Sequence, residues 1–341
     1  MKKLSSIFYI AGFSLMLLAG FLQAFGQETG GKTYPRVTSF DARFDKLVPK
    51  GAKIEKLADG FSWVEGPVWD KKGKSLLFSD IPNNAIIKLQ NTTTGVFLKP
   101  SGYTGSAPFT GREPGSNGLT FDREGRLTIA QHGDRRVVRR EKDGSITVLA
   151  EKYEGKRLNS PNDLVFRSNG DLYFTDPPFG LPKILADPAK ELSFQGVYRL
   201  SKDGKLELLN DEIRYPNGIA FSPDEKTLYV SNSERENPVW YAFDVKKDGS
   251  LGEKRVILDA SGWKALPGSP DGMKVDRNGY IFSGAPGGIR VFDPQDRKLL
   301  GVFEFDVPTA NCSWGDDGSV LYITSNTAIY RIRLNTKGAK F

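Results

Sequence analysis

The chain alternates short apolar runs with turns rich in Asp, Gly and Asn, and this arrangement repeats six times. Each unit begins with an acid or amide and a small or polar residue, followed by an apolar run, a turn and a second apolar run. Runs of this length between turn residues predict β-strands. The six units are EGPVWDKKGKSLLFSD from Glu65, NGLTFDREGRLTIAQH from Asn117, NDLVFRSNGDLYFTD from Asn162, NGIAFSPDEKTLYVSN from Asn217, DGMKVDRNGYIFSG from Asp271 and NCSWGDDGSVLYITS from Asn311.

The spacing of the units predicts propeller blades. Successive units start 52, 45, 55, 54 and 40 residues apart, and a four-stranded blade takes about 40 to 45 residues. Further runs such as Arg136–Arg140 and Ile146–Ala150 supply third and fourth strands. We therefore predict an all-β, six-bladed β-propeller with four-stranded antiparallel blades. The expected second strands are Leu76–Ser79, Leu127–Ala130, Leu172–Thr175, Leu228–Ser231, Tyr280–Ser283 and Leu321–Thr324.

The two ends of this repeat region complete each other. The last unit has only three strand-like runs, at Cys312–Gly315, Val320–Thr324 and Ala328–Ile332. The run Lys53–Ala58, ahead of the first unit, supplies the fourth strand, and joining the ends removes the edges that an open sheet exposes. We expect one propeller domain over residues 51–341, preceded by a lead-in segment over residues 27–50.

Residues 1–26 have the features of a secretory signal peptide. Two lysines precede an apolar run from Ile7 to Leu22, and small residues stand at the −3 and −1 positions of a cut before Gln27. The run is shorter than the roughly 20 apolar residues that a membrane span needs. We expect export across the inner membrane, to the periplasm, and no membrane attachment after cleavage.

Composition excludes several function classes. The chain is 38% hydrophobic, and its formal charge of +7 falls to +5 without the two lysines of the leader. Its charges are interspersed, so nucleic-acid binding is not expected. The single cysteine, Cys312, excludes an internal disulfide. With only one histidine, His132, the chain also lacks the nitrogen and sulfur ligands of a zinc or copper site.

The residues that open the six units are the candidate functional residues. In a propeller the first strand of each blade lines the central channel, so equivalent positions converge on its axis. The alternative is six blade-entry turns, which suits Asn117, Asn217 and Asp271, each followed by Gly. It does not suit Glu65, because Glu is not a left-handed turn former and Pro67 lies two positions later. The predicted ring of oxygen-bearing side chains consists of Glu65, Asn117, Asn162, Asn217, Asp271 and Asn311.

A cation is expected within this ring. Two carboxylates, Glu65 and Asp271, lie in a narrow channel, and burying either charge without compensation costs several kcal/mol. Carboxylate and amide oxygens suit a hard divalent ion, Ca²⁺ first and then Mg²⁺ or Mn²⁺, with Fe²⁺ left open. The sequence therefore predicts one divalent cation as cofactor.

The chain resembles the gluconolactonase/regucalcin/luciferin-regenerating enzyme family. The resemblance rests on EGPVW at 65–69, SPNDL at 160–164, YPNGIAFSPD at 215–224 and SPDGMKVD at 269–276, and NGLTFDREGRLTIAQHGDRRV from Asn117 is similar to the bacterial gluconolactonase branch. It implies a six-bladed propeller with one divalent cation, a small-molecule sugar lactone as substrate and a hydrolase activity. It also implies that the metal ligands are Glu65, Asn162, Asn217 and Asp271, with Asn117 and Asn311 beside them.

A second tier of residues follows the ring residues by thirteen to fifteen positions, and ordinary hairpin pairing would place it near the same channel mouth. Solvated strand ends are the alternative. We expect Asn117, Asn162, Asn232 and Arg112 to contact substrate, with Arg290 as a further candidate. The members of the second tier are Asp80, His132, Asp176, Asn232, Gly284 and Ser325.

The resemblance suggests a mechanism in which the cation polarises the lactone carbonyl for attack by water. Asp271 is the first choice as general base, or as nucleophile, but a carboxylate that donates to a cation is a weak base. Asp176 or His132 is the alternative base, since a lone histidine at a channel mouth can move protons near neutral pH. Substrate choice is expected in two long loops, 99–116 and 177–195, which carry Tyr103, Phe109 and Phe179.

Two other function classes stay open. The same site could serve another ester, phosphotriester or sugar-processing hydrolase, because fold does not determine function. A non-catalytic calcium-binding propeller is the second class, although two carboxylates at the channel axis count against a pure scaffold. A condensing propeller similar to strictosidine synthase is more remote. The oligomeric state is open, and a monomer is compatible with the sequence.

Overall fold

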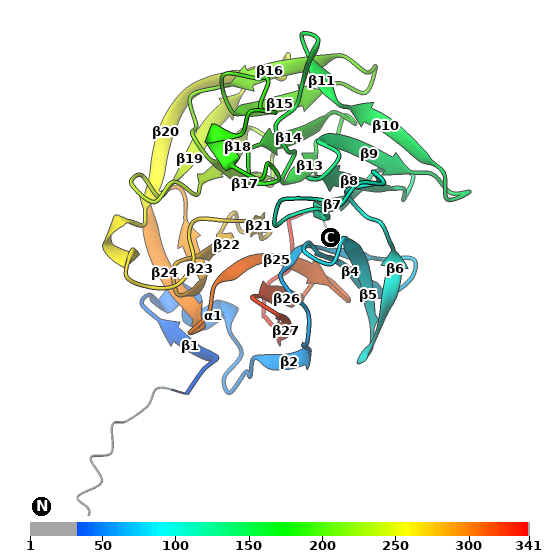
Figure 1. The fold of residues 1–341 in the computed structure, drawn as a ribbon. Helices are drawn as coiled ribbons and strands as arrows, with labels where there is room; N and C mark the ends of the chain where they lie inside the picture. Colours follow the sequence, from blue (N-terminus) through cyan, green and yellow to red (C-terminus); the bar gives the residue numbers. More distant parts are fainter. Residues whose placement is uncertain (1–32, 340–341) are drawn as a thin grey trace, which may run out of the picture. The chain divides into compact units, whose positions relative to one another are not determined.

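The computed structural model describes residues 33–339, and the chain from Tyr34 onward forms one compact unit. Its strands form six main antiparallel sheets arranged in a ring (Figure 1). This is the predicted six-bladed β-propeller, and the six second strands lie where the sequence places them. Residues 1–26, where the signal peptide is predicted, lie outside the described residues. Within the described part, no helix is long and apolar enough to cross a membrane.

Five of the blades have four strands each. Blade 1 is β3 (Val64–Asp70), β4 (Ser75–Asp80), β5 (Ala85–Gln90) and β6 (Thr93–Leu98). Blade 2 is β7 (Ser116–Phe121), β8 (Leu127–Gln131), β9 (Arg136–Arg140) and β10 (Ile146–Ala150). Blade 3 is β13 (Leu164–Phe166), β14 (Leu172–Asp176), β15 (Gly196–Leu200) and β16 (Leu206–Asn210). Blade 4 is β17 (Pro216–Phe221), β18 (Thr227–Asn232), β19 (Val239–Val245) and β20 (Leu251–Asp259). Blade 6 is β25 (Thr309–Gly315), β26 (Val320–Ser325), β27 (Ala328–Arg333) and β2 (Glu55–Ala58).

Blade 5 and the connections hold the remaining elements. Blade 5 is β21 (Met273–Val275), β22 (Ile281–Ala285), β23 (Gly288–Asp293), β24 (Lys298–Glu304) and a fifth strand, β1 (Arg36–Ser39). A small hairpin of β11 (Lys152–Tyr153) and β12 (Lys156–Arg157) follows blade 2. Among residues 33–339 the helical elements are α1 (Ala42–Leu47) and two 3₁₀ turns, η1 (Ile184–Ala186) and η2 (Ser261–Trp263).

The predicted closure of the ring is confirmed. β2 pairs with β27, so a strand from ahead of the first unit completes the last blade. Strand edges that would otherwise stay open at the junction are thereby paired. In Figure 1 the blue β2 lies beside the red β27.

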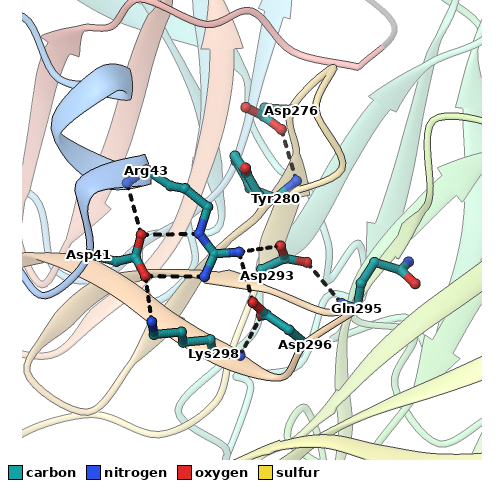
Figure 2. Close-up of polar contacts among 8 residues, drawn as sticks. All are labelled: Asp41, Arg43, Asp276, Tyr280, Asp293, Gln295, Asp296 and Lys298. Atoms are coloured by element: carbon teal, nitrogen blue, oxygen red, sulfur yellow. Dashed lines mark hydrogen bonds and ion pairs between the residues drawn. The ribbon is translucent and has the colours of Figure 1, made fainter.

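The chain before residue 51 is more than a lead-in. β1 pairs with β24 as the outer strand of blade 5, and α1 contacts the same blade, so the compact unit begins at Tyr34 and not at residue 51. Asp41 caps α1 by accepting a hydrogen bond from the Arg43 backbone, 2.9 Å. Its carboxylate also pairs with the side chains of Arg43 and Lys298 (Figure 2). Those hydrogen bonds, that of Arg43 first, hold the pKa of Asp41 well below its usual range.

The hydrophobic core consists of six clusters, most of them lying between neighbouring blades. Between blades 1 and 2, Leu77 and Ile86 pack with Ile129 and Val138, and all four are buried. Each sheet therefore buries apolar side chains on both faces, as sheets packed face to face do. This packing holds the first strands in place around the channel.

Candidate metal centre

The six first strands contact one another in sequence around the channel, and the last contacts the first. The ring residues lie at the start of these strands. In four of them, β3, β7, β17 and β25, a β-bulge or irregularity interrupts the pairing at or beside the ring residue. In blades 3 and 5 the strand begins only after it. A bulge bends the strand and re-aims a side chain, so the regular ladder starts only beyond the ring.

The glycines that follow Asn117 and Asn217 are required by space and not by turn geometry. A Cβ on Gly118 would lie 2.5 Å from the Asn162 oxygen, and one on Gly218 would lie 2.3 Å from the Asp271 oxygen. Neither glycine has a positive φ. The alternative of blade-entry turns therefore does not explain these two Asn-Gly pairs through a left-handed glycine. At these two positions glycine is needed because the backbone of the next blade comes so close, whereas Gly66, which follows Glu65, combines such a close approach with a positive φ of 51°.

The two carboxylates of the ring meet in the channel. Glu65 is 3% exposed, and its Oε2 accepts hydrogen bonds from the Gly66 backbone at 2.7 Å and from Asn311 Nδ2 at 3.1 Å. Asp271 keeps some exposure, and its Oδ1 accepts from the Gly272 backbone at 2.9 Å. Burial raises the pKa of both carboxyls, and the charge of Glu65 raises that of Asp271 further. The two carboxylates repel each other unless a proton or a cation binds to them.

A third carboxylate, Asp163, was not predicted. It is 3% exposed, its Oδ1 accepts from the Leu164 backbone at 2.8 Å, and its Oδ2 has no hydrogen-bond partner among the described residues. Burial raises the pKa of Asp163, while the positive charge of Lys274 opposes the rise. Asp163 also adds repulsion to Glu65 and Asp271. With three carboxylates ionised and the lysine protonated, the group has an excess of two negative charges, which a divalent cation balances.

Two amides of the ring present their oxygens for binding. Asn217 donates from Nδ2 to Ser233 Oγ at 2.9 Å, and Asn162 places Nδ2 at 3.5 Å from His132 Nε2. No hydrogen bond from the described residues reaches Oδ1 of either amide. Asn311 is arranged the other way, because its Oδ1 accepts from the Cys312 backbone at 2.9 Å while its Nδ2 donates to Glu65. Among these three ring amides, only those of Asn162 and Asn217 therefore have an Oδ1 that accepts no hydrogen bond from the described residues.

These donors fit a hard divalent cation. The described residues contain no group of three or more His, Cys, Asp or Glu side chains arranged to hold a metal, so the set is a mixed one of carboxylate and amide oxygens. Such a set suits Ca²⁺ or Mg²⁺ and not zinc. Asn117 also belongs to the ring and is 5% exposed. Its side chain forms no hydrogen bond with the described residues, and its backbone oxygen accepts from Ser79 Oγ at 2.7 Å.

Three members of the second tier anchor the approach to the ring. Asp176 Oδ2 accepts from the Asn159 backbone and Oδ1 from the Ser160 backbone, each at 2.8 Å. Asp80 Oδ1 accepts in the same way from the backbones of residues 62 and 63, and Asn232 Oδ1 from the backbone of residue 215. All three are almost fully buried, so they are not solvated strand ends. Burial raises the pKa of Asp176 to about 7.

The predicted equivalence of His132 with these anchors is wrong by one residue. Pairing sets Val64 opposite Asp80 and Pro216 opposite Asn232, and in blade 2 it sets Ser116 opposite Gln131. Gln131 is the anchor of that blade, since its Nε2 donates to the Ser101 oxygen at 2.8 Å. His132 therefore does not anchor the backbone of blade 2.

His132 lies beneath both long loops. It is fully buried, and its Nδ1 is 2.8 Å from Oε2 of Glu113, a residue of the 99–116 loop that was not predicted as part of the site. A Cβ on Gly180, in the 177–195 loop, would lie 2.7 Å from the His132 Cβ. Glu113 could have been noticed as the only acid in its loop.

The other residues predicted to contact substrate lie in different surroundings. Arg112 is exposed and forms no hydrogen bond or ion pair with the described residues. Arg290 is 5% exposed, lies 3.8 Å from the ring centroid of Trp263, and donates from Nε to the Pro286 oxygen. Burial lowers the pKa of Arg290 to about 10. Phe179 stacks on Tyr215 with ring centroids 5.7 Å apart.

A cavity of about 950 Å³ lies at the other end of the first strands. Its lining includes Val68, Phe121, Phe221, Val275 and Trp314, which are the far ends of those strands, and it includes no ring residue. The candidate metal centre and this cavity are therefore at different ends of the first strands.

Comparison with known proteins finds a matching family and relatives that align with most of the chain. The SMP-30/gluconolactonase/LRE-like region matches residues 63–327. A gluconolactonase of Zymomonas mobilis is 39% identical over 330 residues, which cover 94% of this chain and 92% of that protein. Pentonolactonase of Haloferax volcanii is 28% identical over 76% of this chain and 80% of its own. The solved structure of a gluconolactonase from Xanthomonas campestris is similar at a TM-score of 0.76 and 33% identity, over 87% of this chain and 94% of that one.

Proposed function

Because this chain belongs to the SMP-30/gluconolactonase/LRE-like family, we propose that it is a lactonase, a carboxylic ester hydrolase that opens a sugar lactone with the aid of a divalent cation. The observation that carries the proposal is the meeting of two ring carboxylates, the buried Glu65 and the partly exposed Asp271, with two amides whose oxygens have no partner among the described residues. The lactonases among the relatives support the substrate class.

Glu65, Asp271, Asn162 and Asn217 would hold the cation. We rank Ca²⁺ first, because the donors are all oxygens and the carboxylates with Lys274 leave an excess of two negative charges. When bound, a divalent cation supplies Lewis-acid polarisation of the lactone carbonyl and stabilises the charge that develops on its oxygen.

Asp271 is the proposed general base. It is the ring carboxylate that keeps some exposure to the channel, and only one of its oxygens accepts a backbone hydrogen bond. It would take a proton from the attacking water as the new C–O bond forms. It would then return the proton to the ring oxygen as the ester bond breaks, which releases the hydroxy acid.

The other two candidate bases are unequal. Asp176 is fully buried and both of its oxygens accept backbone hydrogen bonds, which supports a structural role. His132 faces the ring through Nε2 and is the alternative base if Asp271 donates too strongly to the cation. Direct attack by Asp271 as nucleophile is a further variant of the same proposal.

The long loops would provide the walls of the substrate pocket. Phe179 and Tyr215 form a stacked aromatic pair, and Tyr103 and Phe109 form another with centroids 5.1 Å apart. Aromatic faces pack against the apolar face of a sugar ring, while Asn117 would offer hydrogen bonds to its hydroxyls. Asn232, the other predicted contact, is held by the backbone at both ends of its amide and would support the pocket from behind. Arg112, which is exposed, would contribute only if the 99–116 loop turned it inward. We also propose that the chain is exported to the periplasm, on the features of residues 1–26.

The test is hydrolysis of a panel of aldonolactones by the purified mature protein, with acid release followed by a pH indicator. Three arms are compared: metal-stripped protein, protein restored with Ca²⁺, Mg²⁺ or Mn²⁺, and Asp271→Ala. We expect turnover that needs the cation and is lost in the variant. If a cation binds but no lactone opens above the spontaneous rate, the proposal fails, and esters, phosphotriesters or a purely calcium-binding role take its place.

A further inference from the structure

We propose that Glu113 and His132 are positioning residues that orient the Asn162 amide toward the cation, so that the 99–116 loop controls the affinity of the site for metal. The inference rests on the metal centre of the proposed function. It assigns no proton transfer to either residue.

The contacts form a chain from the loop to the ring. Glu113 Oε2 lies 2.8 Å from His132 Nδ1, and His132 Nε2 lies 3.5 Å from Asn162 Nδ2, which is the long end of hydrogen-bond distance. A carboxylate only accepts hydrogen bonds, so it favours the tautomer with the proton on Nδ1. That tautomer leaves a lone pair on Nε2, which attracts the NH₂ group of Asn162. The oxygen of the amide is then turned away from the imidazole.

No other group among the described residues can fix the tautomer of His132. Its Nδ1 is buried and has no hydrogen-bond partner of good geometry, so Glu113 is the only acceptor within reach although the contact is not linear. The His132 side chain is fully buried, and Gly180 lies close to its Cβ. The Glu113 side chain itself is 29% exposed. The chain of contacts therefore begins at a carboxylate that loop movement can withdraw.

The other ligand amide provides the contrast. Asn217 Nδ2 donates to Ser233 Oγ at 2.9 Å, and that hydroxyl in turn contacts the Pro270 oxygen at 2.5 Å. Both contacts lie in the segments beside the ring and involve neither long loop. Asn217 is therefore oriented whatever the loops do, whereas Asn162 is oriented only when Glu113 is in place. Groups that orient metal ligands typically change metal affinity by about 10- to 100-fold when removed.

The coupling works in both directions. If an ordered 99–116 loop strengthens cation binding through Asn162, then a bound cation must favour the ordered loop by the same factor. Because this loop carries Tyr103 and Phe109, cation binding would also prepare the wall of the substrate pocket.

The experiment measures Ca²⁺ binding by isothermal titration calorimetry, independently of turnover. Glu113→Ala is expected to raise the dissociation constant about 10-fold. Glu113→Gln, which keeps an acceptor of the same size, should recover most of the affinity. Glu253→Ala, an exposed glutamate on β20, is the control and should bind Ca²⁺ like the wild type.

A second variant tests the order of the chain. His132→Leu fills the buried volume but removes both nitrogens, and it should weaken Ca²⁺ binding at least as much as Glu113→Ala. The double variant should lose no more than His132→Leu alone, because the two residues act through one path. Melting temperatures of the metal-free variants show whether the fold is retained.

Activity then separates positioning from proton transfer. At saturating Ca²⁺ the kcat of Glu113→Ala should return to within a few-fold of the wild type. The inference is overturned if Ca²⁺ affinity is unchanged in Glu113→Ala, or if kcat stays low at saturating Ca²⁺. If the wild type binds Ca²⁺ but opens no lactone, the proposed function fails while the calorimetric result still decides the inference. If the wild type binds no divalent cation, both fall.

Discussion

Two layers of the same repeat carry similar side chains and use them differently. The anchoring layer consists of the second-tier residues Asp80, Asp176 and Asn232. Both oxygens of Asp176 accept backbone hydrogen bonds, and in blade 4 the amide of Asn232 bonds to the backbone through both its oxygen and its nitrogen. In the ring layer, the amides of Asn162 and Asn217 are held only through nitrogen. The Oδ1 atoms of these two amides accept no hydrogen bond from the described residues. The difference separates side chains that hold the blade together from side chains that are the proposed cation ligands.

The same contrast appears in charge. Asp176 is a single carboxylate surrounded by backbone donors, with Arg135 and Lys190 in electrostatic range. Glu65, Asp163 and Asp271 instead repel one another, and Lys274 opposes only part of that repulsion. A protein keeps such a repulsive group only where something else compensates it. Four changes test the contrast between the two layers.

The largest effect is expected in the ring layer. Asp271→Asn keeps the shape of the side chain but removes the negative charge and the base. We expect kcat/KM for the best lactone to fall by at least about a thousandfold, since both cation binding and proton transfer are affected. Stability of the metal-free protein should rise, because the repulsion with Glu65 is gone. Steady-state kinetics and thermal melts of the stripped protein measure the two changes. An active variant, or one less stable without metal, would contradict the assignment.

The next effect concerns the pH dependence of stability. Burial raises the pKa of Asp176 from 3.8 to about 7. Between these two pH values the folded state therefore keeps a proton on this carboxyl that the unfolded state has lost. This group therefore contributes its stability in full below pH 4 and loses it as the pH rises to about 7, by up to about 1.4 kcal/mol per pH unit. In Asp176→Asn that contribution to the slope should disappear. Urea unfolding at several pH values, with excess Ca²⁺ in both proteins, gives the difference. Parallel slopes would show that the carboxyl is not protonated in the fold.

A smaller effect is expected from the anchor in blade 1. Asp80→Ala leaves backbone N–H groups of residues 62 and 63 without their acceptor and should cost about 1–3 kcal/mol of unfolding free energy. Asp80→Asn should cost less, because Asn232 performs the same task in blade 4. The two variants are compared by chemical denaturation. Equal losses in both would mean that the charge of Asp80, and not its hydrogen bonds, is what matters.

The smallest effect belongs to the periphery. Arg43 pairs with Asp41, Asp293 and Asp296 where α1 meets blade 5 (Figure 2). These pairs are partly exposed, so Arg43→Ala should lower the melting temperature only slightly, and the difference should shrink in high salt. Lactone turnover should be unchanged. A large loss of stability would show that β1 and α1 are needed to hold blade 5 in the ring.

Much of the fold was predictable because its signals are local. The six repeats show the strand and turn residues directly, and the missing strand of the last unit reveals how the ring closes. β1 and α1 were not predicted, because one short strand has no repeat partner and finds its place only on the edge of β24. The shift from His132 to Gln131 in blade 2 comes from its hairpin turn, which is one residue shorter. Phe121 pairs with Leu127, six positions on, whereas Trp69 and Phe221 pair with residues seven positions on.

The sequence by itself determined the propeller, its six-fold repeat, the closing strand and which six positions share one place in each blade. It did so because strand length, turn chemistry and period are written along the chain. Only the tertiary structure decided which oxygens are left free, that Asp163 joins the carboxylates, and that Glu113 reaches His132. Those facts depend on contacts between segments far apart in sequence. Hydrogen bonds and charge–charge interactions depend on distances in space, which the order of residues along the chain does not show.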